Sequence, residues 1–259
     1  MSDILNLSRA GRVLRIALNR PEKRNALNTE LCRELVAALE DADSDLHIGA
    51  ILLCANGKHF CAGMDLSEVA TAAPAQISTA QEQLFTIGSR LGKPLIAAVQ
   101  GAALGGGMGL AGNCHIVVAQ PQATFGLTEI RVGLWPFLVF RALTLAVGER
   151  RVTELALTGR TFGAEEARAI GLVHEVTPDA ESRAAAIAST LAEYSPTTIR
   201  AGMTFVEQAR GRDWISAGEI ARRVREEVFA SPDFREGLRA FEEKRPPRWP
   251  SLAKDKAGE

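Results

Sequence analysis

Three adjacent glycines, Gly105 to Gly107, are the part of this sequence best suited to chemistry. They follow an apolar run at 94–99 with the pattern of a buried strand, and they precede small apolar residues typical of a tightly packed helix. Glycines at a helix start are costly, because each loses more backbone entropy on folding than alanine would. They also leave N–H groups uncovered at the positive end of the helix dipole, where an anion or a developing oxyanion is stabilised.

The glycines at 107–112 also match the dinucleotide fingerprint G-x-G-x-x-G. That motif needs a tight turn from strand to helix and an acidic residue at the end of the next strand. Here several residues separate the strand from the glycines, and the next apolar run, at 115–119, ends in Gln120 and Pro121. We therefore favour an oxyanion hole for a thioester carbonyl. Close helix packing by the glycines is compatible with either interpretation.

A second stretch, KHFCAGMDL at 58–66, follows an apolar strand at 48–54, and with it the chain resembles the crotonase, or enoyl-CoA hydratase/isomerase, family. The matching pieces lie in the family's order: Asn25–Asn28, Phe60–Leu66, Lys93–Val99, Gly101–Gly107, Phe125–Glu129, Ala164–Ala167, Gly171–Val173 and Phe241–Arg245. The resemblance covers nearly the whole chain. It implies an enzyme that acts on an acyl-CoA thioester, with coenzyme A as part of the substrate and no separate cofactor.

The resemblance assigns the oxyanion hole to the backbone N–H groups of Met64 and Gly106. Two such donors stabilise the enolate that forms when a thioester loses its α-proton, and one donor contributes ~10²–10³ in rate. These assignments do not depend on side-chain identity, so the side chain of Met64 is free to fill the core.

The acid–base groups depart from the family pattern. Typical hydratases carry two glutamates: Glu129 matches one, and the position of the other is Gly109. Water addition normally uses both carboxylates, whereas one carboxylate suffices to move a double bond. We therefore expect one-base isomerisation by Glu129. Hydration by an altered or water-assisted mechanism, or a degenerate acyl-CoA-binding protein with little turnover, are the alternatives, and an ion pair of Glu129 with Arg131 is the purely structural interpretation. Substituting Gly109→Glu should then raise hydration, with overpacking as its cost.

The resemblance also implies substrate-binding residues. Lys23 and Arg24 lie in a loop that follows the CoA tail in the family. In the family's trimer, Lys244 or Arg245 would approach the CoA phosphates of the same or a neighbouring subunit. Large apolar residues replace the glycines of the family's G-x-x-P-x-x-G-G-T segment at 133–140, which indicates a reshaped acyl pocket containing Trp135 or simply core packing. The remaining residues lie beside the glycine turns: Ala26, Ala62, Asp65, Leu66 and Gly105.

Composition excludes several other functions. Lys and Arg number 30 against 31 Asp and Glu, and the helix predicted at 28–43 carries an acidic face that would repel phosphate, so we expect no nucleic acid partner. No stretch reaches the roughly 18 apolar residues of a membrane span, and the N-terminus lacks a secretory signal. The sequence therefore predicts a cytoplasmic protein with no membrane partner.

Cysteine and histidine spacing predicts no metal site. The four cysteines lie mostly in apolar runs and indicate packed, reduced thiols. The four histidines show no metal-ligand spacing, and no G-x-S-x-G motif accompanies them, so a serine hydrolase is also excluded.

The elements that must position these residues alternate between strand and helix up to about residue 176 and are helical from residue 178 onward. The pattern predicts an α/β core. The resemblance implies a crotonase-like spiral of strand-strand-helix units with a helical C-terminal region that builds a homotrimer or a dimer of trimers. We place the catalytic core at 1–195 and the helical region at 196–259, and we expect the tail after residue 244 to be poorly ordered.

Overall fold

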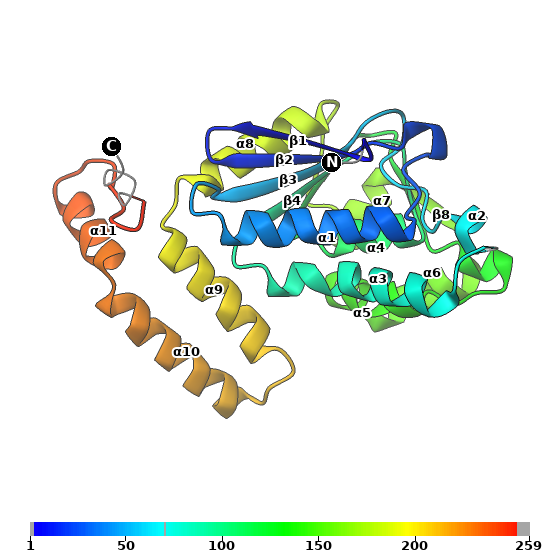
Figure 1. Cartoon of the computed structure of the whole chain (residues 1–259). Helices are drawn as coiled ribbons and strands as arrows, with labels where there is room; N and C mark the ends of the chain where they lie inside the picture. Colours follow the sequence, from blue (N-terminus) through cyan, green and yellow to red (C-terminus); the bar gives the residue numbers. More distant parts are fainter. Residues whose placement is uncertain (1–2, 70, 253–259) are drawn as a thin grey trace.

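A sheet of mostly parallel strands forms the centre of the molecule (Figure 1). The computed structural model describes residues 3–69 and 71–252, and within these ranges the sheet has the order β1-β2-β3-β4-β6-β9. Its strands are β1 (Leu5–Ala10), β2 (Val13–Leu18), β3 (Ala50–Ala55), β4 (Leu95–Val99), β6 (Ile116–Ala119) and β9 (Glu175–Val176). In this sheet only β1 runs antiparallel to its neighbour, because the Ala10-Gly11 turn folds β1 and β2 into a hairpin.

A second sheet of three short strands, β5 (Ala102–Leu104), β7 (Thr124–Gly126) and β8 (Thr161–Gly163), carries the residues predicted to do chemistry. Helix α4 (Gly106–Gly112) follows β5, and the 3-10 helix η3 (Glu129–Val132) follows β7. Since β5 and β7 are parallel, both segments leave the sheet at the same edge. These strands were not predicted from the sequence, because strands of three residues are too short to show alternation.

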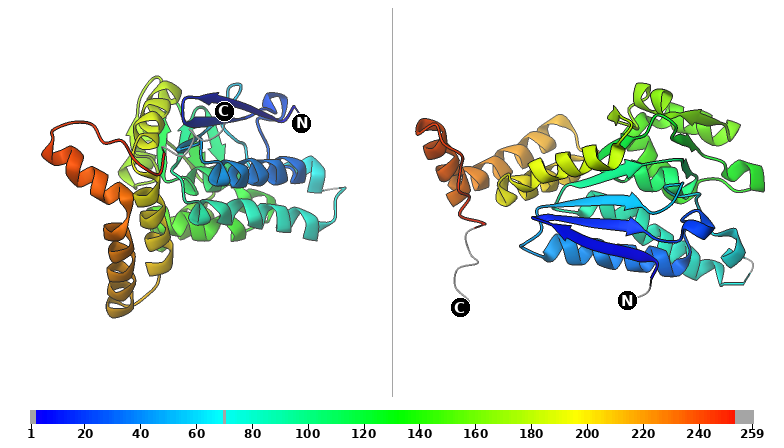
Figure 2. Two further views of the ribbon diagram at one scale, coloured as in Figure 1. Left: turned by 60° about the vertical axis from the view of Figure 1, so that its left-hand side comes forward. Right: turned by 90° about the horizontal axis from the view of Figure 1, so that it is seen from above.

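Helices cover both faces of the large sheet. Helices α1 (Thr29–Ser44) and α3 (Pro74–Ile87) lie on one face and α8 (Ala180–Ala192) on the other (Figures 1 and 2). Alternate residues of β3 accordingly belong to two hydrophobic clusters, Ile51 and Leu53 on the α1 side and Leu52 on the α8 side. The strand is buried along its whole length, as its uninterrupted apolar run predicted.

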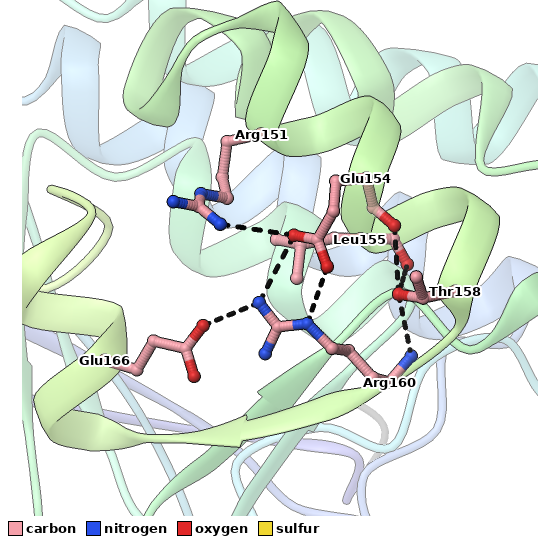
Figure 3. Close-up of polar contacts among 6 residues, drawn as sticks. All are labelled: Arg151, Glu154, Leu155, Thr158, Arg160 and Glu166. Atoms are coloured by element: carbon pink, nitrogen blue, oxygen red, sulfur yellow. Dashed lines mark hydrogen bonds and ion pairs between the residues drawn. The ribbon is translucent and has the colours of Figure 1, made fainter.

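An arginine links the helices around β8. Arg160 follows α6 (Glu149–Thr158); its Nε donates to Glu154 Oε1 at 2.7 Å and its Nη2 donates to Glu166 Oε1 at 2.6 Å, in α7 (Ala164–Ala169) (Figure 3). The same guanidinium lies 5.4 Å from the ring centroid of Phe162 in β8. Because Phe162 pairs with Phe125 in β7, this cluster fixes the strand that leads to Glu129.

Three helices project from the core as an arm: α9 (Pro196–Ala209), α10 (Trp214–Ala230) and α11 (Pro232–Glu242) (Figures 1 and 2). The predicted boundary at residue 195 coincides with Ser195, the N-cap of α9. Much of the arm's apolar surface is uncovered in the single chain. The remaining helices are η1 (Pro21–Lys23), α2 (Leu66–Val69), η2 (Gly88–Arg90) and α5 (Phe137–Val147).

The expectation of a poorly ordered tail is wrong for residues 245–252. Arg245 forms an ion pair with Glu236 at 2.6 Å, the indole N–H of Trp249 donates to the carbonyl of Glu193 at 2.8 Å, and Ser251 Oγ donates to Asp233 at 2.6 Å. Composition suggested disorder, but these polar contacts hold the tail against the base of the arm. Residues 253–259 lie outside the described part of the chain.

Candidate active site

The two predicted oxyanion donors lie close together. The turn before α2 runs beside the start of α4, since Cys61 and Ala103 form a parallel bridge. A Cβ built on Gly63 would lie 3.5 Å from the amide nitrogen of Gly106. In the described part of the chain, neither the N–H of Met64 nor that of Gly106 donates to another protein group. Two uncovered donors therefore stand side by side.

The glycines are required by this close approach. A Cβ on Gly107 would lie 2.1 Å from the carbonyl oxygen of Cys61, and one on Gly63 would lie 2.9 Å from the carbonyl oxygen of Leu104. Gly105 has φ +52°, a left-handed conformation that glycine adopts without strain. Side chains at these positions would separate the two turns.

Glu129 lies next to the donors. A Cβ on Gly105 would be 2.9 Å from Glu129 Oε1, so the carboxylate is adjacent to the residue before Gly106. Its Oε2 is buried and has no hydrogen-bond partner among the described residues, and no ion pair joins it to Arg131 there. Burial raises the pKa of Glu129 above its ordinary value, and its own backbone N–H opposes that shift only in part. A partly desolvated carboxylate without a partner is a more basic carboxylate.

A buried asparagine, Asn25, joins the loop at 20–28 to the turn before α2. It was not among the residues predicted from the sequence. Asn25 Nδ2 donates to the carbonyls of Asn56 (3.0 Å) and His59 (2.8 Å), and its Oδ1 accepts from the N–H of Arg20 (2.8 Å). The N–H of Ala62 donates to the carbonyl of Arg24 at 3.0 Å. A fully buried asparagine must satisfy its polar atoms, but two of the partners of Asn25 are distant in the sequence, so no local pattern pointed to this role.

Lys23 and Arg24 therefore lie in a loop that is hydrogen-bonded to the turn before α2. Both side chains are exposed and form no ion pair within the described residues. The carboxylate of Asp65 contacts Arg20 (2.9 Å) and Ser67 Oγ (2.5 Å). Burial pushes the pKa of Asp65 upward, but the hydrogen bonds from Ser67 and Arg20 outweigh it and lower that pKa. Asp65 thus fixes the turn.

The other predicted substrate-binding residues lie around the same turns. Ala26 is buried and its carbonyl accepts from Arg20, Ala62 is half-buried, and Leu66 is exposed at the start of α2. Trp135 is partly buried against the core, with its ring centroid 6.1 Å from that of Phe140.

The predicted residue Lys244 lies far from this site. It follows α11, which lies at the opposite end of the molecule from α2 in Figure 1 and in the right-hand view of Figure 2. The arm carries it away from the core, so within one chain Lys244 does not meet Met64, Gly106 or Glu129. Only the arm of another copy could bring it there.

Histidines and cysteines have structural positions. His59, His115 and His174 each accept a hydrogen bond on Nδ1 from a backbone N–H, those of Ala102, Leu95 and Val117. All four cysteines are buried and unpaired, and burial raises the pKa of the Cys61 thiol to about 12. Among the described residues no group of three or more His, Cys, Asp or Glu side chains is placed to hold a metal ion, and no helix there is long and apolar enough to cross a bilayer.

Comparisons with known proteins agree with this geometry. A family model described as enoyl-CoA hydratase/isomerase matches residues 8–252. The chain is 36% identical over 251 residues to the 2,3-dehydroadipyl-CoA hydratase of Escherichia coli (strain K12), covering 95% of this chain and 98% of that protein.

Solved structures show the same architecture. The enoyl-CoA hydratase of Mycobacterium smegmatis superposes with a TM-score of 0.91 at 30% identity, covering 96% of this chain and 99% of that one. The enoyl-CoA hydratase of Bacillus anthracis gives a TM-score of 0.88 at 31% identity, covering 95% and 98%. The predicted α/β fold with its helical C-terminal region is confirmed.

Proposed function

The chain belongs to the enoyl-CoA hydratase/isomerase family of enzymes that act on acyl-CoA thioesters, and from this premise we propose that it moves the double bond of a 3-enoyl-CoA to the 2-position with Glu129 as its base. The observation that carries the proposal is the pairing of one half-buried carboxylate, whose Oε2 has no hydrogen-bond partner among the described residues, with a glycine, Gly109, where a second carboxylate is expected.

The reaction needs only proton movement. Glu129 removes a proton from C2 of the thioester, and the electron pair delocalises through the carbonyl and the C3–C4 double bond as a dienolate. The N–H groups of Met64 and Gly106 donate to the oxygen as it becomes negative. The same carboxyl group returns the proton at C4, so the double bond lies between C2 and C3 and no other reactant is consumed.

The raised pKa of Glu129 suits this role. A carboxylate in water is a weak base, and burial narrows the gap in pKa between it and the thioester α-carbon. Within the proposal, Lys23 and Arg24 hold the phosphates of coenzyme A, the main chain at Ala26, Ala62, Leu66 and Gly105 lines the thioester, and Trp135 borders the acyl group. A cytoplasmic location also stays a prediction.

Hydration is the second candidate, because the Escherichia coli relative is named for it. Water addition places a hydroxyl group on C3 and a proton on C2. With Gly109 in place of a carboxylate, Glu129 would have to activate the water and another water would have to supply the proton. A binder with little turnover is the third outcome.

Two substrates separate these functions. We expect 3-hexenoyl-CoA to gain the absorbance of a conjugated thioester at least tenfold faster than crotonyl-CoA loses it. Glu129→Gln should lower that isomerisation by ~10²–10⁴, the usual contribution of a positioned acid–base group, with acyl-CoA affinity nearly intact. Glu82→Gln, an exposed glutamate of α3, is the matched control.

Faster hydration than isomerisation would assign the chain to the second candidate. Binding without either reaction would assign it to the third. Unchanged isomerisation in Glu129→Gln would remove this residue from the mechanism.

A further inference from the structure

We infer that Val139 determines the reaction specificity of this site, because its side chain occupies the volume that a second acid–base group and its water would need. The inference rests on the proposed function and goes beyond it by naming the residue that keeps hydration out.

The contact between α4 and α5 places Val139 there. A Cβ on Gly109 would lie 2.2 Å from Val139 Cγ1 and 2.5 Å from Val139 Cβ. Three residues further on, a Cβ on Gly112 would lie 2.7 Å from Leu143 Cδ2. Since Gly109 and Gly112 share one helix face, as do Val139 and Leu143, α5 packs directly onto the glycine face of α4.

This contact corrects one expectation from the sequence. The substitution Gly109→Glu alone would place its Cβ inside a buried valine rather than beside Glu129. The close-packing interpretation of the glycines also holds for Gly109 and Gly112, while Gly105 to Gly107 form the turn that carries the N–H group of Gly106. One glycine-rich helix thus serves both purposes.

Phe85 of α3 completes an apolar wall. Its Cζ would lie 3.3 Å from a Cβ on Gly106, and its Cε1 would lie 3.4 Å from one on Gly109. Phe85 and Val139 are both buried, and Leu27 Cδ1 comes within 3.1 Å of the same Cβ position on Gly106. Carbon atoms therefore surround the face of α4 between the oxyanion donor and residue 109.

A water molecule has no place on that face. A buried water needs two to four polar partners, and the three side-chain atoms nearest to a Cβ on Gly109 are carbons of Val139 and Phe85. Water addition at the double bond requires a positioned water, a group to take its proton and a group that protonates C2. Proton transfer by Glu129 requires none of these, so the wall favours isomerisation over hydration.

The packing of α5 alone could also explain Val139, and Leu143 separates the two explanations. Leu143 fills the same helix contact one turn later, against Gly112, and does not reach Gly109. Shortening Leu143 loosens the contact without opening the face beside residue 109. Leu143→Ala is thus the matched control.

The experiment introduces the carboxylate with and without room for it. Variants are Gly109→Glu alone and in combination with Val139→Ala, Val139→Gly or Leu143→Ala, and hydration of crotonyl-CoA is measured for each. In Val139→Ala the Cβ of residue 139 would remain 2.5 Å from the Cβ of residue 109, so only Val139→Gly provides space for the glutamate. We expect Gly109→Glu/Val139→Gly to hydrate crotonyl-CoA at least tenfold faster than Val139→Gly, and the other combinations to show no gain.

A second measurement does not depend on the double variant folding. Val139→Gly by itself opens the wall to solvent, so in D₂O the 2-enoyl product should contain at least twice the deuterium that the parent's product contains, and Leu143→Ala should leave it unchanged. Deuterium content equal to the parent's, or a folded double variant that hydrates no faster than Val139→Gly, would overturn the role of Val139.

Failure of the proposed function is distinguishable from this outcome. If the parent does not isomerise 3-hexenoyl-CoA, one-base isomerisation is wrong, whereas the hydration series still reports on Val139. If the parent isomerises and the series shows no gain, Val139 is a packing residue only.

Discussion

Among individual residues, Glu129 stands in surroundings that oppose its charge. One carboxylate oxygen is buried without a partner among the described residues, and burial raises the pKa. An environment that disfavours the charge is expected for a catalytic base, because its surroundings are suited to the reaction rather than to the stability of the fold. The residue should therefore lower stability at the pH where it is active.

The pH dependence of that effect can be predicted. The pKa of Glu129 is higher in the folded than in the unfolded chain, so protonation of Glu129 stabilises the folded chain. This stabilisation is complete at pH values below the pKa of the unfolded chain and is lost as pH rises through the pKa of the folded chain. Glu129→Gln removes the buried charge. We expect the melting temperature of the variant, relative to the parent, to be higher at pH 8 than at pH 5.

Thermal unfolding at both pH values measures this difference, and about 1 kcal/mol corresponds to roughly 2–4 °C in a chain of this size. Glu82→Gln should show no such pH dependence, because that side chain is exposed. An equal shift at both pH values would mean that Glu129 is not penalised by burial.

The sequence predicted the residues whose local pattern is complete and missed those defined by tertiary contact. Gly106 and Glu129 follow short strands, and the sequence motifs around them are enough to single them out as candidate site residues. Val139 could be described only as an apolar replacement, since its contact with Gly109 depends on how α5 packs on α4. Asn25 was missed for the same reason, because its partners lie 31 and 34 residues away.

For the secondary-structure elements, the end of α1 depends on a buried lysine. Lys93 Nζ donates to the carbonyl of Ala42 at 2.6 Å, one of the acceptors that a helix C-terminus leaves unpaired. It also donates to the carbonyl of Asp45 at 2.5 Å, which accepts from the N–H of Ile48 as well. The lysine precedes β4, so it joins α1 to the central sheet. The apolar run after Lys93 predicted strand β4, but the link between Lys93 and α1 appears only in the structure.

Lys93→Met should destabilise the fold. Burial lowers the pKa of Lys93 to about 8, so its charge is disfavoured, yet the neutral amine still donates and methionine cannot. The buried carbonyl of Ala42 would lose this donor, whereas that of Asp45 would keep the N–H of Ile48, and we expect a loss of about 1–3 kcal/mol in the free energy of unfolding. Urea denaturation measures it, with exposed Lys58→Met as control. A loss no larger than that of the control would contradict the link.

On the scale of the whole molecule, the arm is incomplete in a single chain. Trp214 is 94% exposed, Ile215 78% and Phe241 84%, which is unusual for large apolar side chains unless they contact a partner. Lys244 follows Phe241 closely in the chain, after α11, which lies far from α2 in Figure 1. Both observations support the proposal that copies assemble as a trimer or a dimer of trimers, each arm serving a neighbour.

Complementation between two variants tests that arrangement. On the proposed mechanism, Glu129→Gln should inactivate its own site but keep Lys244, whereas Lys244→Ala should keep the base but weaken substrate binding. If Lys244 acts across subunits, mixed assemblies contain sites with an intact Glu129 from one chain and an intact Lys244 from its neighbour. Variants co-assembled from dilute denaturant should then isomerise 3-hexenoyl-CoA, at low substrate concentration, faster than the average of the two separate proteins.

Light scattering at micromolar concentration provides the control, since the parent and both variants should have the mass of three or six chains. A monomeric parent would contradict the assembly outright. If the variants are trimers but their mixture shows only the average activity, the proposed assembly stands and Lys244 lies outside the active site. Each site would then function without the arm of its neighbour.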